Sequence, residues 1–116
     1  MKQKFLPFFL LVLLLPFSII SLSGQVVYSC DSKYDADVKV YVVDSKYDAD
    51  LVVYKCSSKY DAEGNKGLWH FTENKYDADK KVWFADSKYD ADLLIYFSDS
   101  KYNAEWRNKE KIYLMY

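Results

Sequence analysis

The stretch Asp44-Ser45-Lys46-Tyr47-Asp48-Ala49-Asp50, with the apolar residues 51–56 behind it, decides the fold of this chain. Its Lys-Tyr dipeptide occurs six times, at 33/34, 46/47, 59/60, 75/76, 88/89 and 101/102. The spacing between successive copies is constant except after the third, where it is longer. A short fixed period of this kind is typical of repeat architectures, in which each unit packs against its neighbours.

A second, longer period groups the six units in threes. The third and sixth units carry Glu63 and Glu105 in place of the second aspartate, and a longer connection follows each of them. Five residues before each repeat lysine stands an aromatic ring or histidine, and members of this column that lie three units apart correspond: Tyr28 and His70, Tyr41 and Trp83, Tyr54 and Tyr96. The repeat region therefore consists of two successive blocks of three units, and a break in the repeat follows each block.

Between the Lys-Tyr motifs the apolar runs alternate with a period of two, which predicts strands. We expect seven of them, beginning near Val26, Val38, Leu51, Leu68, Lys81, Leu93 and Ile112. The Asp-Ser-Lys-Tyr-Asp-Ala-Asp segments favour turns, because Asp and Ser side chains bond to nearby backbone amides. Seven residues are too few for a helical crossover, so the prediction is an all-β domain of strand-plus-turn repeats and not an α/β fold.

One face of these stretches holds the predicted core. Its residues are Val38, Val40 and Val42; Leu51, Val53 and Lys55; Trp69 and Phe71; Lys80, Val82 and Phe84; Leu93, Ile95 and Phe97; and Ile112 and Leu114. The opposite face carries the Tyr/His/Trp column and is expected to be half solvated.

Residues 1–23 have the three-part pattern of a secretory signal: Lys2 and Lys4, an apolar run over 5–20, and small residues before Gly24. The alternative is an uncleaved membrane anchor, but the run is short and contains two prolines. We therefore expect residues 24–116 to form one exported domain, in the periplasm, on the cell surface or secreted, with no stable membrane insertion after cleavage. Removing Lys2 and Lys4 from the 16 basic residues leaves 14, against 17 acidic ones, which argues against nucleic acid as a partner.

The tandem Asp-Ser-Lys-Tyr-Asp-Ala-Asp units, as at 44–50 and 86–92, resemble the septoil-knot family of small bacterial domains of unknown function. The resemblance covers about 26–116 and implies a compact, monomeric β domain whose backbone forms a seven-crossing torus knot. It supplies no catalytic or ligand-binding residues. Chains rarely thread their own loops, so composition and spacing alone predict a small β-barrel or sandwich.

Two kinds of chemistry compete with a purely architectural repeat. The carboxylate pairs, such as Asp48/Asp50, invite a calcium site, but a lysine precedes each pair and the glycine of an EF-hand loop is missing. Capping and exposed Lys-Asp pairing explain them better. Catalysis needs one asymmetric arrangement, whereas the single histidine, His70, occupies a position filled elsewhere by Tyr and Trp. We expect no enzyme, no metal and no cofactor.

The expected function is a stable structural or interaction module whose partner the sequence does not name. The alternative is a glycan- or peptide-binding module that uses exposed aromatic residues at the repeat breaks. Its candidate residues are Trp106, Arg107, Trp83 and His70. Against it stands the possibility that Trp69 and Trp83 belong to the core and that Trp106 covers one end of the sheet.

Cys30 and Cys56 stand three residues before their repeat lysines, and a disulfide between them is open from the sequence. Two cysteines in an exported domain often pair. In a simply ordered sheet, however, equivalent positions two units apart lie ~9.6 Å from each other, beyond the reach of a disulfide of about 7 Å. The bond would require the first and third strands to be neighbours.

Overall fold

The computed structural model describes residues 25–116, so the predicted leader (1–23) lies outside the described residues. The strands are β1 (Val26–Ser29), β2 (Val38–Val42), β3 (Leu51–Lys55), β4 (Leu68–Thr72), β5 (Lys80–Phe84), β6 (Leu93–Phe97) and β7 (Glu105–Trp106). The 3-10 helices are η2 (Lys33–Asp35), η3 (Lys46–Asp48), η4 (Lys59–Asp61), η5 (Lys75–Asp77), η6 (Lys88–Asp90), η7 (Lys101–Asn103) and η8 (Lys109–Met115). The all-β prediction is confirmed.

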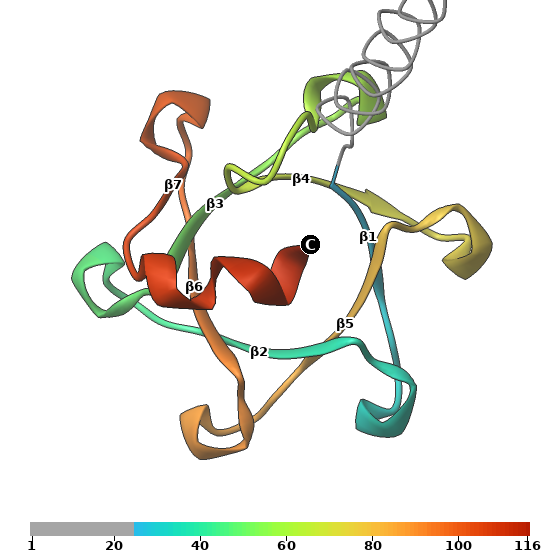
Figure 1. Ribbon diagram of the computed structural model, residues 1–116, viewed down its shortest axis with the longest axis horizontal. Helices are drawn as coiled ribbons and strands as arrows, with labels where there is room; N and C mark the ends of the chain where they lie inside the picture. The colour runs from blue at the N-terminus through green and yellow to red at the C-terminus, as the bar shows by residue number, and fades with distance from the viewer. Residues whose placement is uncertain (1–24) are drawn as a thin grey trace, which may run out of the picture.

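The first six strands form a closed parallel barrel. Their order around it is β4, β1, β5, β2, β6 and β3, and pairing of β3 with β4 closes the ring. Strands of the first block therefore alternate with strands of the second, and the chain passes twice around the barrel axis (Figure 1). The short strand β7 lies outside the ring and pairs antiparallel with the first half of β3.

The stagger of the strands explains how such short turns can join parallel strands, which usually need long crossovers. Ser29 at the end of β1 pairs with Val82 of β5, and Val82 pairs on its other side with Val38 at the start of β2. The end of each strand thus lies level with the beginning of the next, two strand spacings away. A connection needs to span only about 10 Å, and the excess chain loops outward.

The barrel interior is filled by side chains of the predicted core face, including Val40, Val53, Trp69 and Ile95, all of which are fully buried, and by Val27 of β1, which that prediction did not include. The prediction fails at two strand ends, where Val42 and Lys55 are exposed, and at Val52 on the opposite face of β3, which is buried. At the end where the strands finish, the rings of Phe71, Phe84 and Phe97 form a triangle with centroids 6.3–6.5 Å apart.

At the opposite end, where the strands begin, η8 crosses the barrel opening (Figure 1). Met115 is fully buried there, and its carbonyl accepts a hydrogen bond from Gln25 Nε2 at 3.0 Å. A seventh strand was predicted near Ile112, and this prediction is wrong. Because the barrel is closed and residues 105–106 already pair with β3, that segment has no strand edge to join, and a helix satisfies its backbone groups instead.

The six connecting segments, η2 to η7, have one design. A residue before each 3-10 turn accepts a hydrogen bond from the backbone N–H of the repeat tyrosine at 3.0–3.3 Å. Ser fills this position in five units, and Asn74 fills it in the other with the same contact. The alanine N–H then donates to the lysine carbonyl and ends the turn. Serine and asparagine are preferred at such capping positions for this reason.

The second aspartate of four units clamps neighbouring strands together. Its backbone N–H donates to a carbonyl on the adjacent strand, and its carboxylate accepts from the N–H of that same residue; the pairs are Asp37 with Lys81, Asp50 with Leu94, Asp79 with Val26, and Asp92 with Lys39. The expected Lys-Asp pairing on the rims is wrong. Within residues 25–116 the only ion pair joins Lys111 and Asp50.

Candidate binding grooves

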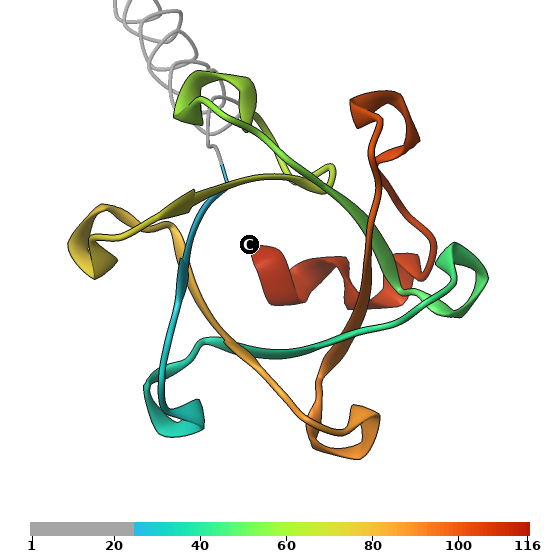
Figure 2. The same cartoon turned by 180° about the vertical axis from the view of Figure 1, so that it is seen from behind.

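The tips of the six connecting segments project from the barrel like petals (Figure 2). Each tip presents the tyrosine of its Lys-Tyr dipeptide to solvent, with 73–88% of the residue exposed. The ammonium group of the adjacent lysine lies 5.4–5.7 Å from the centre of that ring. Six Tyr rings with neighbouring cations are therefore displayed around the molecule.

Grooves run along the outer barrel wall between a tip of the first block and the corresponding tip of the second. Three of them correspond in the repeat: the η2–η5, η3–η6 and η4–η7 grooves. Each has a half-buried strand tyrosine, a tip carboxylate from the first block and a tip ammonium group from the second. These are Tyr28, Asp35 and Lys75; Tyr41, Asp48 and Lys88; and Tyr54, Asp61 and Lys101.

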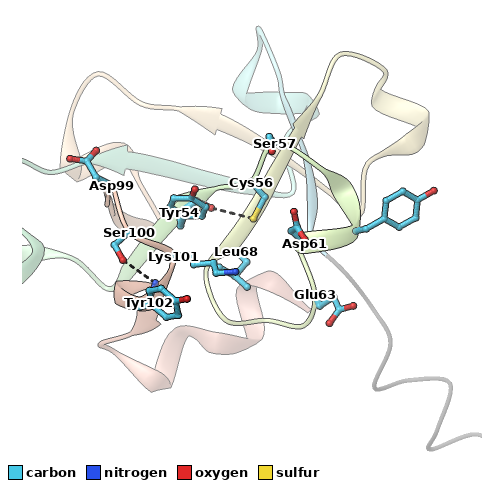
Figure 3. A pocket seen from close by; sticks show the side chains of 11 residues that line it. Tyr54, Cys56, Ser57, Asp61, Glu63, Leu68, Asp99, Ser100, Lys101 and Tyr102 are labelled. Carbon is cyan, nitrogen blue, oxygen red and sulfur yellow. Dashed lines mark hydrogen bonds between the residues drawn. The ribbon is translucent and has the colours of Figure 1, made fainter.

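The η4–η7 groove has the largest volume of the three, about 760 Å³, against about 590 and 190 Å³ for the η3–η6 and η2–η5 grooves. It borders the first repeat break. Ala62 ends η4 with ψ at 59° instead of the 146° found at the same position of η3, and the chain then turns away through Gly64. Figure 3 shows Tyr54 and Tyr102 at one side of the groove and Asp61 and Glu63 at the other.

The thiol of Cys56 also lines this groove, where it lies 4.0 Å from the carbonyl oxygen of Tyr54 (Figure 3). Burial raises the pKa of this thiol, and the negative charge of Asp61 raises it further, while Lys101 opposes the shift. The group is therefore protonated at neutral pH. A thiol of this kind is a weak nucleophile, because the thiolate is the reactive form.

The sequence of the repeat region matches the model of a known family. Residues 24–107 match the family described as the 7(1) septoil knot domain. The chain belongs to this family. No curated protein and no solved structure matches the chain. The interleaved strand order is consistent with a knotted path, because the strands of the second turn around the barrel axis lie between the strands of the first.

In this septoil knot domain the four residues predicted to bind a ligand do not lie together in one site. Trp106 is 8% exposed, and its indole N–H donates to the backbone and side-chain oxygens of Asn65 at 3.0 and 3.1 Å. The binding hypothesis needed an exposed Trp106 and is therefore wrong for this residue, whereas its burial agrees with the other interpretation, that Trp106 covers one end of the sheet. Its bonds to Asn65 join the second break to the first. Arg107 is exposed, and its guanidinium lies 5.5 Å from the ring centre of Tyr47 on η3.

His70 and Trp83 are half-buried on the outer wall of the septoil knot domain, on β4 and β5. The strand β1 separates them, so they do not form one site with each other. His70 Nδ1 lies 2.9 Å from the carbonyl oxygen of Cys56, and the ammonium group of Lys33 lies 6.0 Å from the Trp83 ring. Both residues pack in the position that Tyr occupies in other units.

The open possibility of a disulfide is not realised. Cys30 and Cys56 are both free and buried, because β4 lies between β1 and β3 in the closed ring. Burial raises the pKa of the Cys30 thiol as well, with nearby Asp35 adding to the effect.

Among residues 25–116, no three His, Cys, Asp or Glu side chains converge in a way that would hold a metal ion. The paired aspartates suggested a calcium site in the sequence, but the two members of each pair lie in different places in the structure. The second of each regular pair bonds to a neighbouring strand, and the first lies on an exposed tip. In the same part of the chain no helix is long and apolar enough to cross a bilayer.

Sequence reasoning missed the grooves. Their floor and walls come from positions that recur with the repeat, and Asp35, Asp48 and Asp61 each stand at the same separation before the lysine on the opposite wall. This constant separation was visible in the sequence. Its meaning depended on the interleaving of the two blocks, which brings each tip beside the tip three units later.

Proposed function

We propose that this domain is an exported, monomeric interaction module without catalysis, and that its contact surface is the set of six Lys-Tyr tips. One observation carries the proposal. The Lys-Tyr side chains are the same in all six units and are displayed to solvent, while the contacts that hold the fold come from other groups: the Ser or Asn cap, the turn backbone and the clamping aspartates. Exposed tyrosines are enriched where proteins bind partners.

The state of the nucleophilic groups supports a role without catalysis. Both thiols are buried with raised pKa values, and the single histidine bonds to a backbone carbonyl on the barrel wall. A catalytic constellation would bring a nucleophile and a base within hydrogen-bond reach of each other.

Export is supported by the leader pattern over residues 1–23. N-terminal sequencing of the protein recovered from cells is expected to begin at Gly24, and native mass spectrometry is expected to give a monomer. A protein that retains Met1, or that stays in the cytoplasm, would refute the export proposal.

The alternative of a glycan or peptide site at the repeat breaks loses its main support. Trp106, its principal aromatic residue, is buried against Asn65 and offers no ring to a ligand. Arg107 remains exposed but lies over Tyr47, and its contact belongs to the η3 tip. The breaks thus serve the packing of the barrel opening.

The contact surface can be tested by removing the tip rings. The variant carries Ser at Tyr34, Tyr47, Tyr60, Tyr76, Tyr89 and Tyr102. Wild-type protein immobilised on beads is expected to retain a defined envelope or extracellular partner. The six-site variant is expected to retain at least tenfold less of this partner. Circular dichroism should show the same melting temperature within a few degrees, because these rings are exposed.

The matched control replaces Tyr113 and Tyr116, which are exposed tyrosines away from the six tips. This double variant is expected to retain the partner as the wild type does. Equal loss in the control, or undiminished retention by the six-site variant, would refute the assignment of the tips.

A further inference from the structure

The three corresponding grooves carry a more specific assignment, which rests on the proposed interaction function and names a ligand class for it. We propose that the η2–η5, η3–η6 and η4–η7 grooves bind neutral oligosaccharides, with a sugar ring placed on the strand tyrosine of each groove. The floor residues are Tyr28, Tyr41 and Tyr54, all of them half-buried in the barrel wall.

The floor of each groove suits the apolar face of a sugar. A tyrosine that is half-buried in a strand is held in place by its neighbours, so little side-chain entropy is lost when a ligand covers it. Its ring presents a partly negative face, to which the C–H groups on one side of a pyranose ring are attracted. Three such floors recur at the same position of successive units.

The walls of each groove suit the hydroxyl groups at the edge of a sugar. One wall supplies a carboxylate, Asp48 or Asp61 in the two wider grooves, and the opposite wall supplies an ammonium group, Lys88 or Lys101. Serine hydroxyls lie beside them. Within the described residues, none of these four charged groups takes part in a side-chain hydrogen bond or ion pair, so acceptors and donors are both free for a ligand.

Charge favours a neutral sugar over an anionic one. The η4–η7 groove is lined by Asp61, Glu63 and Asp99 against the single Lys101. The η3–η6 groove likewise has three carboxylates and one lysine, and the η2–η5 groove has two of each. A uronic acid or a sulfated sugar would meet a net negative wall in the two wider grooves and be repelled.

The closed barrel disfavours a peptide in the same grooves. An extended peptide commonly binds by adding a strand to a free sheet edge, and an amphipathic helix needs an apolar channel. Here the six barrel strands pair with one another around the ring. The grooves are lined largely by Tyr, Ser, Asp and Lys, which provide no continuous apolar channel.

The three grooves differ in the length of saccharide that they can hold. The η4–η7 and η3–η6 grooves, at about 760 and 590 Å³, have room for two or more sugar rings, whereas the η2–η5 groove, at about 190 Å³, has room for one. Binding at several grooves of one molecule strengthens attachment to a polysaccharide surface without any new contact.

The test uses the purified full chain on an array of neutral, anionic and amino-sugar glycans, followed by calorimetric titration with cellotetraose and maltotetraose. We expect binding of neutral glycans, with more than one site per protein. Tyr41→Ser combined with Tyr54→Ser is expected to weaken binding at least tenfold. Asp48→Asn and Lys88→Gln change exposed wall groups without affecting the fold, and each is expected to weaken binding severalfold.

Tyr113→Ser, which alters an exposed ring outside the grooves, is expected to bind as the wild type does. No neutral-glycan binding at millimolar ligand, equal binding by the wall variants, or exclusive binding of anionic glycans or peptides would each overturn the assignment. This test can fail while the proposed function holds. If removal of the tip rings abolishes partner retention but the protein binds no glycan, the saccharide sites are refuted and the interaction function is still supported.

Discussion

The six tips and the two repeat breaks differ in what their residues hold together. A tip closes on itself through a Ser or Asn cap and an alanine N–H, and its Lys-Tyr side chains face solvent. The breaks, at 62–67 and 104–116, join parts of the chain that are far apart: Trp106 bonds to Asn65, and Gln25 bonds to Met115. The comparison teaches that repetition builds the barrel wall, whereas the departures from repetition close its ends.

Asp50 shows how one repeat position serves both regions. Like its equivalents it clamps a neighbouring strand, at Leu94. Unlike them it is buried, and its carboxylate also accepts from Lys111 Nζ at 3.2 Å and from Asn108 Nδ2 at 3.3 Å. The C-terminal segment is therefore attached to the barrel through a position that belongs to the regular repeat.

The largest effect is expected at Gly67, inside the first break. Its φ is +90°, and a Cβ atom there would overlap the carbonyl oxygen of Val52 on β3. Gly67→Ala is expected to lower the free energy of unfolding by about 4 kcal/mol through backbone strain and this overlap. Gly64→Ala is the matched control, since its Cβ meets only the Lys66 side chain, and it should cost about 1 kcal/mol. Urea denaturation measures both; equal losses would contradict the close approach at Gly67.

Asp50→Ala should follow in size. It leaves the N–H of Leu94 and the Asn108 amide without this acceptor, and it leaves the Lys111 ammonium with only the carbonyl oxygen of Asp92, at a cost of about 3 kcal/mol. Asp37→Ala removes one exposed bond, to Lys81, and is expected to cost about 1 kcal/mol. If the two variants unfold at the same urea concentration, Asp50 has no special attachment to the C-terminal segment.

Periodicity predicted the strands because most of them have a buried and a partly solvated face, and this alternation is visible in successive residues such as Val38, Lys39 and Val40. It also predicted turns at the capping residues. Strand order could not be read in this way, because the interleaving of two blocks depends on contacts between units far apart in the sequence. Only the resemblance to a known family pointed to it.

The misplacements have one cause. Tyr113 continues the spacing of the aromatic column, so local pattern placed the stretch that begins near Ile112 in a strand. Trp106 stands in a polar connection, so the binding hypothesis placed it on the surface, while the other interpretation had it cover one end of the sheet. In the closed barrel neither the strand nor the exposed Trp106 is found: no strand edge remains for residue 112, and the open end needs a ring to cover it. Closure of the barrel depends on all six strands together, so the sequence of a single repeat does not predict it.

Removing one turn cap should have a smaller effect, confined to a regular tip. Ser45→Ala deletes the acceptor for the N–H of Tyr47 and is expected to cost about 1 kcal/mol, with the barrel otherwise intact. Asn74→Ser exchanges one cap for the other and is expected to leave the urea midpoint unchanged, since both side chains make the same contact. A large loss for Asn74→Ser would show that the tips are not equivalent.

The smallest effect is expected from the two thiols, one in a regular unit and one beside the first break. Burial raises the pKa of both Cys30 and Cys56 in the folded state. Below the ordinary thiol pKa of about 8.5 both states are protonated and stability is unaffected. As the pH rises above that value, the unfolded chain ionises first, so the free energy of unfolding falls. The wild type should therefore lose more stability between pH 8 and 10 than the double variant C30S/C56S, measured by urea unfolding, and parallel curves would mean that the thiols titrate alike in both states.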